Sequence, residues 1–243
     1  MPGLTLPPFG RAALLLDLDG TLLDIAPTPY TVVVPPGLLA DLRTLRQRLQ
    51  GALAVVSGRP IAQIDALLHD APQAVAGEHG GVIRHSPGAA ERRPALREPP
   101  PAWLAAAETI AAACPGSLLE RKARGFVLHY RAVPEHGPAL HDALLALVDG
   151  AADFVVLPAR MAWEVKPHGA DKGTAVDALM EAPPFVRRLP IFIGDDVTDE
   201  DGMMAARRLG GSGLRVDETF GTPQGVRDWL GRAARDGDWP APG

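Results

Sequence analysis

Residues 12–21 read Ala-Ala-Leu-Leu-Leu-Asp-Leu-Asp-Gly-Thr, an apolar run that stops abruptly at two carboxylates. Two further short apolar runs, residues 52–56 and 191–193, also end abruptly in polar residues. Runs this short and unbroken are typical of parallel strands that are buried on both faces. Helical patterns lie between them, such as the leucines spaced along residues 38–49. The alternation of strand and helix predicts an α/β fold built on a doubly wound parallel sheet.

Polar residues follow each of the three runs. They are residues 17–21 after the first run, residues 57–59 after the second and residues 194–196 after the third. Ligands of open parallel sheets bind beyond the carboxyl ends of the strands. We therefore expect these three segments, far apart in the chain, to converge in space.

The middle of the chain follows another pattern. Within residues 84–166 a helix and two strands are predicted twice in succession, which is an α+β arrangement. We therefore expect residues 84–166 to form an inserted second domain, with a core made of residues 1–83 and 167–243.

Composition restricts the class of protein. The 243 residues are 47% hydrophobic and 22% charged, as is usual for a folded globular chain. A net charge of -5 gives no electrostatic reason to bind nucleic acid or an acidic membrane. The single cysteine, Cys114, cannot form an intramolecular disulfide, and residues 12–16 are too few for a signal peptide or a membrane span. These observations favour the cytoplasm.

Asp17 and Asp19 lie on one side of an extended chain, because side chains alternate along a strand, and Gly20 then lets the backbone turn away. A carboxylate here can attack phosphorus, which divides a difficult hydrolysis into formation and breakdown of an aspartyl phosphate. The second carboxylate can donate a proton to the leaving oxygen and later take one from water. The alternative is that both aspartates serve a helix cap or a turn.

A second group of carboxylates begins at Asp195 and Asp196. Carboxylates crowded around one cleft repel one another unless a cation lies among them. Oxygen ligands beside a phosphoryl group favour magnesium, so we expect Mg²⁺ as the cofactor. Residues 199–201 fit the first turn of the next helix, where the helix dipole favours negative charge, and we assign them a secondary role at most.

Ser57 and Lys172 are candidates for binding phosphoryl oxygens. The hydroxyl can donate a hydrogen bond and the ammonium can neutralise charge, while Gly58 and Gly173 permit close approach of the backbone. Each Ser-Gly or Lys-Gly pair taken alone could equally be a turn or a helix start. Their value lies in their order relative to the two groups of carboxylates.

In that order, Asp-Leu-Asp-Gly-Thr (17–21), Ser-Gly-Arg (57–59), Lys-Gly (172–173) and Gly-Asp-Asp (194–196) resemble the motifs of haloacid-dehalogenase-superfamily phosphatases. The resemblance implies Asp17 as nucleophile, Asp19 as acid/base, Ser57 and Lys172 as phosphate ligands, and Asp17, Asp195 and the Asp19 main-chain carbonyl as metal ligands. We add Asp196 as a candidate metal ligand, and Gly20, Thr21, Gly58 and Arg59 as candidate substrate-binding residues.

A finer resemblance is to bacterial trehalose-6-phosphate phosphatases. It rests on Glu78-His79-Gly80, Glu120-Arg121-Lys122, His129-Tyr130-Arg131, Glu164-Val165-Lys166-Pro167 and residues 194–200. It implies a Rossmann-like core with a mobile α/β cap, and hydrolysis of trehalose 6-phosphate. The substrate contacts that it implies are Glu78, His79, Gly80, Glu120, Lys122, His129, Arg131, Glu164 and Lys166.

Several alternatives stay open. The charged pairs at residues 120/122 and 164/166 fit solvated positions on amphipathic strands, and His79, His129 and Arg131 could be structural. The substrate could be another sugar phosphate, of the sucrose or mannosylglycerate type, or the chain could be a phosphomutase. It could also be a non-catalytic sugar-phosphate-binding domain. The expected partner is a small sugar phosphate, and no obligatory protein partner is evident.

Overall fold

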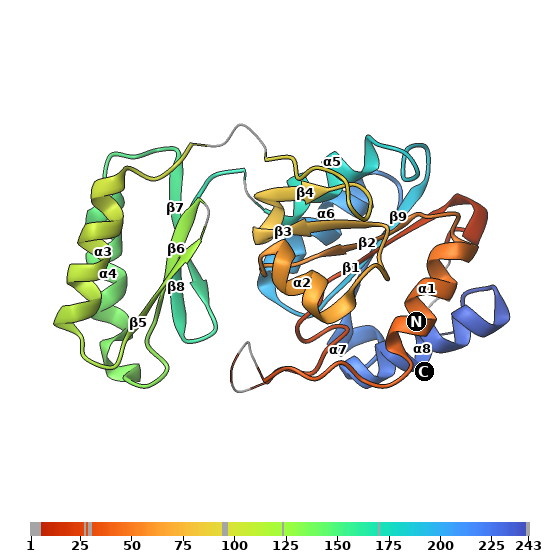
Figure 1. Cartoon of the computed structure of the whole chain (residues 1–243), viewed down its shortest axis with the longest axis horizontal. Coiled ribbons are helices and arrows are strands. Elements are labelled where there is room, and N and C mark those ends of the chain that lie inside the picture. The colour runs from red at the N-terminus through yellow and green to blue at the C-terminus, as the bar shows by residue number, and fades with distance from the viewer. Residues whose placement is uncertain are drawn as a thin grey trace. The chain divides into compact units, whose positions relative to one another are not determined.

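The computed structural model describes residues 6–26, 28, 31–93, 97–122, 124–169 and 171–241. The chain divides into two compact units, shown in Figure 1. One consists of Met1–Arg93 with Asp171–Gly243, and we call it the core; the other is Pro94–Ala170, and we call it the insert. The predicted domain limits, residues 84 and 166, remain a prediction; Arg84 itself ends a strand of the core sheet.

The core contains a six-stranded sheet in the order β10-β9-β1-β2-β3-β4. All neighbouring strands are parallel except β3 and β4. The strands are β1 (Ala12–Leu16), β2 (Leu53–Val56), β3 (Ala74–Gly77), β4 (Val82–Arg84), β9 (Leu189–Gly194) and β10 (Ser212–Arg215). The three apolar runs of the sequence are therefore β1, β2 and β9, and every residue of β1 and β2 is buried.

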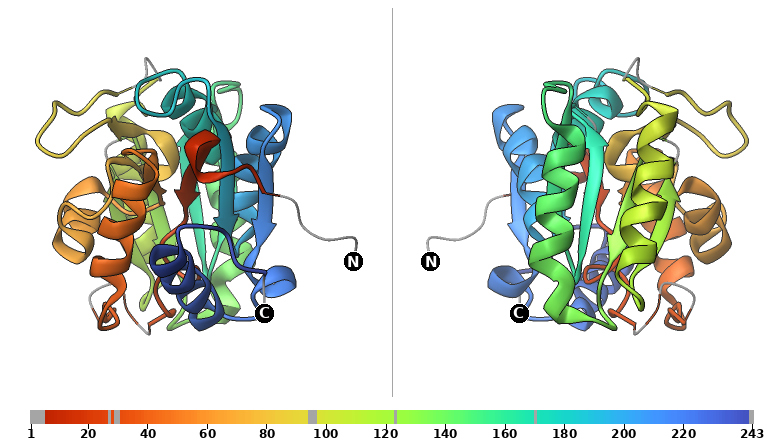
Figure 2. Two further views of the ribbon diagram at one scale, coloured as in Figure 1. Left: turned by 90° about the vertical axis from the view of Figure 1, so that its right-hand side faces the viewer. Right: turned by 90° about the vertical axis from the view of Figure 1, so that its left-hand side faces the viewer.

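Helices cover this sheet, with α1 and α2 on one side of it and α6 on the other (Figures 1 and 2). In the packing of the helices against each other, α1 contacts α8, and α5 contacts α6. The bounds are α1 (Leu38–Arg48), α2 (Ile61–Leu68), α5 (Lys172–Met180), α6 (Glu200–Arg208), α7 (Val216–Thr219) and α8 (Pro223–Asp236), with 3₁₀ turns η1 (Phe9–Arg11), η2 (Glu78–Gly80) and η4 (Val197–Asp199). The predicted doubly wound α/β fold is confirmed.

The insert has a four-stranded antiparallel sheet in the order β5-β6-β8-β7. Its strands are β5 (Leu118–Lys122), β6 (Gly125–His129), β7 (Phe154–Ala159) and β8 (Ala162–Pro167), and its helices are α3 (Pro101–Ala113), α4 (Gly137–Val148) and the 3₁₀ turn η3 (Pro134–His136). Figure 2 shows α3 and α4 side by side against one face of this sheet. The predicted α+β character of the insert is confirmed.

Strand alternation gives the insert's sheet two different faces. Phe126 and Leu128 of β6 belong to the small apolar core under the helices. Val127 and His129 alternate with them and lie on the opposite face, which we call the helix-free face. Among the described helices, none combines the length and apolar character needed to cross a bilayer.

Candidate active site

The three polar segments meet at one edge of the core sheet. Strands β9, β1 and β2 are neighbours and run in the same direction, so their carboxyl ends lie together. The amide of Asp17, the first residue beyond β1, donates a hydrogen bond of 2.9 Å to the carbonyl of Ile193 in β9. The predicted convergence of the three segments is therefore confirmed.

Lys172 holds two carboxylates together at this edge. Its Nζ donates to Asp17 Oδ1 and to Asp199 Oδ1, each over 2.6 Å. All three side chains are buried, with exposed fractions of 3% for Lys172, 6% for Asp17 and 0% for Asp199. Lys172 reaches them from the first turn of α5, which Asp171 and Thr174 begin with a reciprocal capping box. The ammonium is thus fixed by a helix end and two ion pairs.

Asp195 lies beside this group at the end of β9. Its Oδ1 accepts a hydrogen bond of 3.2 Å from the Thr21 hydroxyl. Asp199 supports the same turn, because its Oδ2 accepts from the amides of Asp195 and Asp196 at 3.1 and 3.0 Å. The side chain of Arg215 also donates to the carbonyl of Asp195, at 3.1 Å. Hydrogen bonds from three segments therefore fix the turn that presents this carboxylate.

Asp17, Asp195 and Asp199 each offer one carboxylate oxygen to a common point, and these oxygens lie within 4.8 Å of one another. Ligands on opposite sides of a magnesium ion with bonds of about 2.1 Å are about 4.2 Å apart, so the spacing suits that cation. Three carboxylates against one ammonium also leave an excess of two negative charges. Oxygen-only ligands and this charge fit Mg²⁺, and these three residues would hold it.

The pKa values give the same indication. Burial raises the pKa of Asp17 well above its ordinary value, and the charges of Asp199 and Asp195 raise it further against the opposing effect of Lys172. Burial and Asp199 likewise raise the pKa of Asp195. Burial alone would lower the pKa of Lys172, but Asp17 and Asp199 hold it above its ordinary value. The carboxylates are crowded enough to favour a bound cation.

Asp199 lies within the group of carboxylates, although a secondary role at most was expected for residues 199–201, and Asp196 lies outside that group. Asp196 is exposed and its carboxylate caps η4, accepting from the Val197 amide at 2.6 Å. The group of carboxylates contains Asp199 instead. In the sequence, Asp199 looks like an ordinary acidic residue in the first turn of a helix. Only its contact with Lys172 in the folded chain shows that it belongs to the group of carboxylates. Asp196 as a metal ligand stays a prediction without support from this geometry.

This difference predicts contrasting variants. Replacing Asp199 by asparagine is expected to raise the Mg²⁺ concentration for half-maximal phosphate release by about tenfold to a hundredfold, because a carboxylate near the ion is lost. Replacing Asp196 by asparagine is the matched control and is expected to change it little, since asparagine can still cap η4. Equal shifts in the two metal titrations would contradict the assignment.

Gly20 permits the close packing of the first segment against Asp195. Its φ is +87°, and a Cβ at this position would overlap the Asp195 carboxylate. The predicted turn of the backbone at Gly20 is thus present. Glycine is also needed there because a side chain would collide with Asp195. Thr21, which follows, is fully buried and bonds to Asp195.

Gly20→Ala is expected to lower the rate of phosphate release by about a hundredfold, since a displacement near 1 Å at a catalytic group has that effect. Gly37→Ala is a matched control: its φ is +86°, but nothing lies within 4 Å of the added Cβ. Both substitutions carry the left-handed backbone penalty of about 1–2 kcal/mol, visible in thermal unfolding. Equal activity losses would show that backbone strain alone is responsible.

Asp19 is engaged in an ion pair with Arg59. The guanidinium Nε donates to Asp19 Oδ2 at 2.6 Å and Nη2 donates to Oδ1 at 2.7 Å. This is the two-pronged geometry in which arginine binds a carboxylate most strongly. The exposed fractions are 34% for Asp19 and 11% for Arg59. The structure thus brings two predicted site residues together, with Arg59 oriented toward Asp19.

Ser57 is buried at the end of β2 and lies between Arg59 and the turn η2. Its hydroxyl accepts from the Arg59 amide at 3.2 Å, and its carbonyl accepts from the His79 amide at 3.0 Å. The Glu78 amide donates to the Arg59 carbonyl, also at 3.0 Å. The segment 57–59 and the turn η2 are therefore joined by backbone hydrogen bonds.

The turn η2 has an unusual backbone. Glu78, His79 and Gly80 have φ values of +53°, +56° and +98°. Left-handed conformations of non-glycine residues are costly, and they persist where the surroundings fix them. A Cβ on Gly58 would lie 2.5 Å from His79 Nε2, so that glycine makes room for the imidazole. Glu78, His79 and Gly80, which the finer family resemblance assigns to substrate binding, thus adjoin Ser57, the candidate for phosphate binding.

The remaining candidates belong to the insert. Glu120 and Glu164 both pair with Val127, which places them on the helix-free face, and Lys122 and Lys166 follow two residues later on the same face. His129 Nε2 lies 2.8 Å from Glu120 Oε2, and Lys122 Nζ lies 3.4 Å from Glu164 Oε1. Arg131 is exposed in the turn that follows β6.

The hydrogen bond with His129 lowers the pKa of Glu120 below its ordinary value. Glu120 is therefore ionised at neutral pH and acts as an acceptor. Lys122 and Lys166 are donors. The helix-free face thus offers acceptors and donors side by side, a combination that suits the hydroxyl groups of a sugar. The predicted residues thus fall into one group in the core and a second group in the insert.

The chain is similar to several known proteins. A family model described as trehalose-phosphatase matches residues 15–226. The trehalose-6-phosphate phosphatase of Escherichia coli (strain K12) is 36% identical over 215 residues, 85% of this chain and 77% of the relative. A probable trehalose-phosphate phosphatase of Sinorhizobium fredii (strain NBRC 101917 / NGR234) is 40% identical over 207 residues, 84% and 77% respectively.

Among solved structures, the C-terminal domain of the C. albicans trehalose-6-phosphate phosphatase has a TM-score of 0.77 at 21% identity, covering 93% of this chain and 92% of that one. A parallel core sheet with a separate α+β insert and carboxylates beyond its central strands defines the haloacid-dehalogenase type of phosphatase fold. Within that class, the chain belongs to the trehalose-phosphatase family and is a hydrolase.

Proposed function

We propose that this chain hydrolyses trehalose 6-phosphate to trehalose and inorganic phosphate. The observation that carries the proposal is the buried group of Asp17, Lys172 and Asp199 beside Asp195, in a chain that matches the trehalose-phosphatase family over residues 15–226. The group combines a nucleophile, a phosphate-binding ammonium and a cation site. One relative named above is a trehalose-6-phosphate phosphatase and the other a probable trehalose-phosphate phosphatase, which supports this substrate.

In the proposed first step, an oxygen of Asp17 attacks phosphorus and the bond from phosphorus to the sugar oxygen breaks. Asp19 donates a proton to that oxygen, so that the sugar leaves as a neutral alcohol. In the second step Asp19 takes a proton from water, which attacks phosphorus and releases Asp17 with inorganic phosphate. Both carboxylates return to their starting states.

The other core residues stabilise charge on the phosphoryl oxygens. Lys172 lies 2.6 Å from Asp17 and can neutralise one oxygen, and the Ser57 hydroxyl can donate to another. A bound Mg²⁺ supplies further neutralisation of the phosphoryl oxygens when present. Asp19 is held by Arg59 in this structure, so the ion pair has to loosen before Asp19 can serve as the acid.

The insert is proposed to recognise the sugar. A disaccharide carries many hydroxyl groups and no charge beyond its phosphate, so specific binding needs fixed donors and acceptors. Glu120, Lys122, Glu164 and Lys166 provide them on the helix-free face. We also assign Glu78, His79 and Arg131 to substrate binding on the strength of the family motifs, with Gly80 allowing the turn.

A matched pair of variants tests the role of the helix-free face. Glu120→Gln is expected to raise the KM for trehalose 6-phosphate by about tenfold, because a charged hydrogen bond to a hydroxyl group is worth about 1.5–3 kcal/mol. Glu108→Gln removes another insert carboxylate, one paired with Arg121, and should leave KM unchanged. If both variants keep the original KM, Glu120 does not bind the substrate.

The activity itself is tested by measuring phosphate release from trehalose 6-phosphate with Mg²⁺ and with a chelator. We expect release that the chelator abolishes. Sucrose 6-phosphate, mannosylglycerate phosphate and glucose 1-phosphate form the comparison panel. A preference for another phosphate would overturn the choice of substrate, isomerised product with little free phosphate would indicate a mutase, and binding without turnover would indicate a non-catalytic domain.

A further inference from the structure

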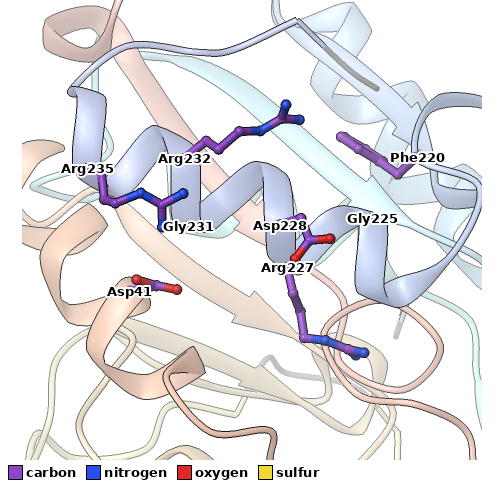
Figure 3. Close-up of a pocket in the computed structure, with 8 residues that line it drawn as sticks. All are labelled: Asp41, Phe220, Gly225, Arg227, Asp228, Gly231, Arg232 and Arg235. Carbon is purple, nitrogen blue, oxygen red and sulfur yellow. The ribbon is translucent and has the colours of Figure 1, made fainter.

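A cavity of about 540 Å³ lies in the core on the exposed side of α8, outside the group of catalytic carboxylates. Figure 3 shows the side chains that line it. They include three arginines, two carboxylates and one aromatic ring: Arg227, Arg232, Arg235, Asp41, Asp228 and Phe220. Asp41 comes from α1, and all the others except Phe220 come from α8.

The helical repeat explains why the arginines gather there. Residues 227, 228, 231, 232 and 235 fall on one side of a helix with 3.6 residues per turn. Val226, Trp229, Leu230 and Ala233 fall on the other side and are buried in the core. Gly231 adds no side chain between the arginines, and a Cβ there would lie 3.1 Å from Asp41 Oδ2 and 3.4 Å from Arg235 Nη1, so the glycine lets these two groups approach the charged side of α8.

Two of these arginines differ from the several core arginines that pair with a carboxylate. Arg43, Arg59, Arg84, Arg208 and Arg215 each pair with a carboxylate. Among the residues that the structure describes, neither Arg232 nor Arg235 has a side-chain hydrogen bond or an ion pair. The Nε of Arg232 is buried with no acceptor within reach in the described chain. That atom itself has no accessible surface, so an acceptor from outside the chain would meet the remaining guanidinium donors of Arg232 and Arg235, both of which line the cavity.

The carboxylates in the cavity wall do not satisfy these donors. Asp228 accepts a hydrogen bond from Gln224 at 2.8 Å, and Arg227 is already bound to Asp24 at 3.1 Å. Arg227 also donates from Nη1 to the Leu22 carbonyl at 3.1 Å, directly after the catalytic segment. The cavity wall is therefore connected to the first catalytic segment, while two guanidinium groups keep their donors available.

We propose that this cavity is a second binding site of the protein, for a small ligand that carries a phosphate group. The planar guanidinium group has donors spaced to bind two phosphate oxygens at once, and two such groups face the cavity. Asp41 and Asp228 can accept hydrogen bonds from hydroxyl groups, and the Phe220 ring offers an apolar contact. A phosphorylated sugar could use all three kinds of contact, whereas inorganic phosphate could use only the guanidinium groups.

The test is a nuclear magnetic resonance titration of the full chain, in chelator, with inorganic phosphate. The reporters are the amides of Gly225 and Gly231, which line the cavity. We expect saturable shifts of both signals in the unaltered chain. In the double variant Arg232→Gln/Arg235→Gln the apparent Kd for phosphate should rise by about tenfold or more. The control Arg187→Gln changes an exposed arginine outside the cavity and should keep the original Kd.

Separate titrations with glucose 6-phosphate and glucose identify the source of the phosphate. Tighter binding of glucose 6-phosphate than of inorganic phosphate supports a phosphorylated sugar, and equal binding supports phosphate itself. Shifts with glucose alone, or an unchanged Kd in the double variant, would overturn the proposal. Should the double variant not fold, the unaltered chain decides: the proposal fails if phosphate produces no saturable shift at Gly225 and Gly231.

Discussion

Asp17→Asn is expected to lower turnover of trehalose 6-phosphate by on the order of 10⁴-fold or more while leaving the fold intact. An amide cannot attack phosphorus, so the covalent step is lost. The fold should persist because asparagine has nearly the same shape and its oxygen can still accept from Lys172, 2.6 Å away in the unaltered chain. Removing one charge from a crowded group also relieves repulsion.

The measurement is phosphate release alongside thermal unfolding of the same preparation. Asp24→Asn is the matched control, since Asp24 lies seven residues further on, pairs with Arg227 at the surface and belongs to no part of the proposed chemistry. Activity retained in the Asp17 variant would remove Asp17 from the role of nucleophile. Loss of folding in that variant would contradict the argument from charge.

Lys172→Met is expected to have the largest effect on stability. The ammonium is the group that compensates Asp17 and Asp199 in the buried cluster, and all three are almost inaccessible to water. Removing one partner from a buried ion pair costs about 3–5 kcal/mol because the other charge remains buried. For a chain of this size that cost corresponds to a fall in Tm of about 6–20 °C. Activity should fall as well.

Mg²⁺ and a second substitution provide the controls. In unfolding experiments without magnesium, Lys172→Met should show the full loss of stability. Added Mg²⁺ should restore part of that stability by neutralising the same carboxylates. The double variant Lys172→Met/Asp199→Asn should be more stable than Lys172→Met alone, since one buried charge has gone, and a double-mutant cycle measures this coupling. Additive losses would show that the three groups do not act as one cluster.

Much of the fold was predictable from local pattern. The runs at β1, β2 and β9 are buried on both faces, so they read as unbroken apolar stretches, and helices of normal spacing separate them. The pattern of the insert is different because its sheet is covered by helices on one face only.

The candidate site was predictable where chemistry is concentrated in short segments. Asp17 and Asp195 directly follow strands and Asp19 comes two residues after Asp17, and the topology of a parallel sheet brings such positions together. Only a secondary role was predicted for Asp199, because an acidic residue in the first turn of a helix is already explained by the helix dipole. Its contact with Lys172 joins residues 27 positions apart and has no signature in either segment alone.

The sequence by itself determined the class of fold, the order of the polar segments and the residue types available to bind a phosphoryl group, since these depend on short-range periodicity and on side-chain chemistry. The tertiary structure alone decided that Asp199 joins the carboxylates, that Arg59 holds Asp19, and that Arg232 and Arg235 share a cavity with Asp41. The physical reason is that pairing and burial depend on distances between side chains far apart in the chain, which only the folded backbone sets.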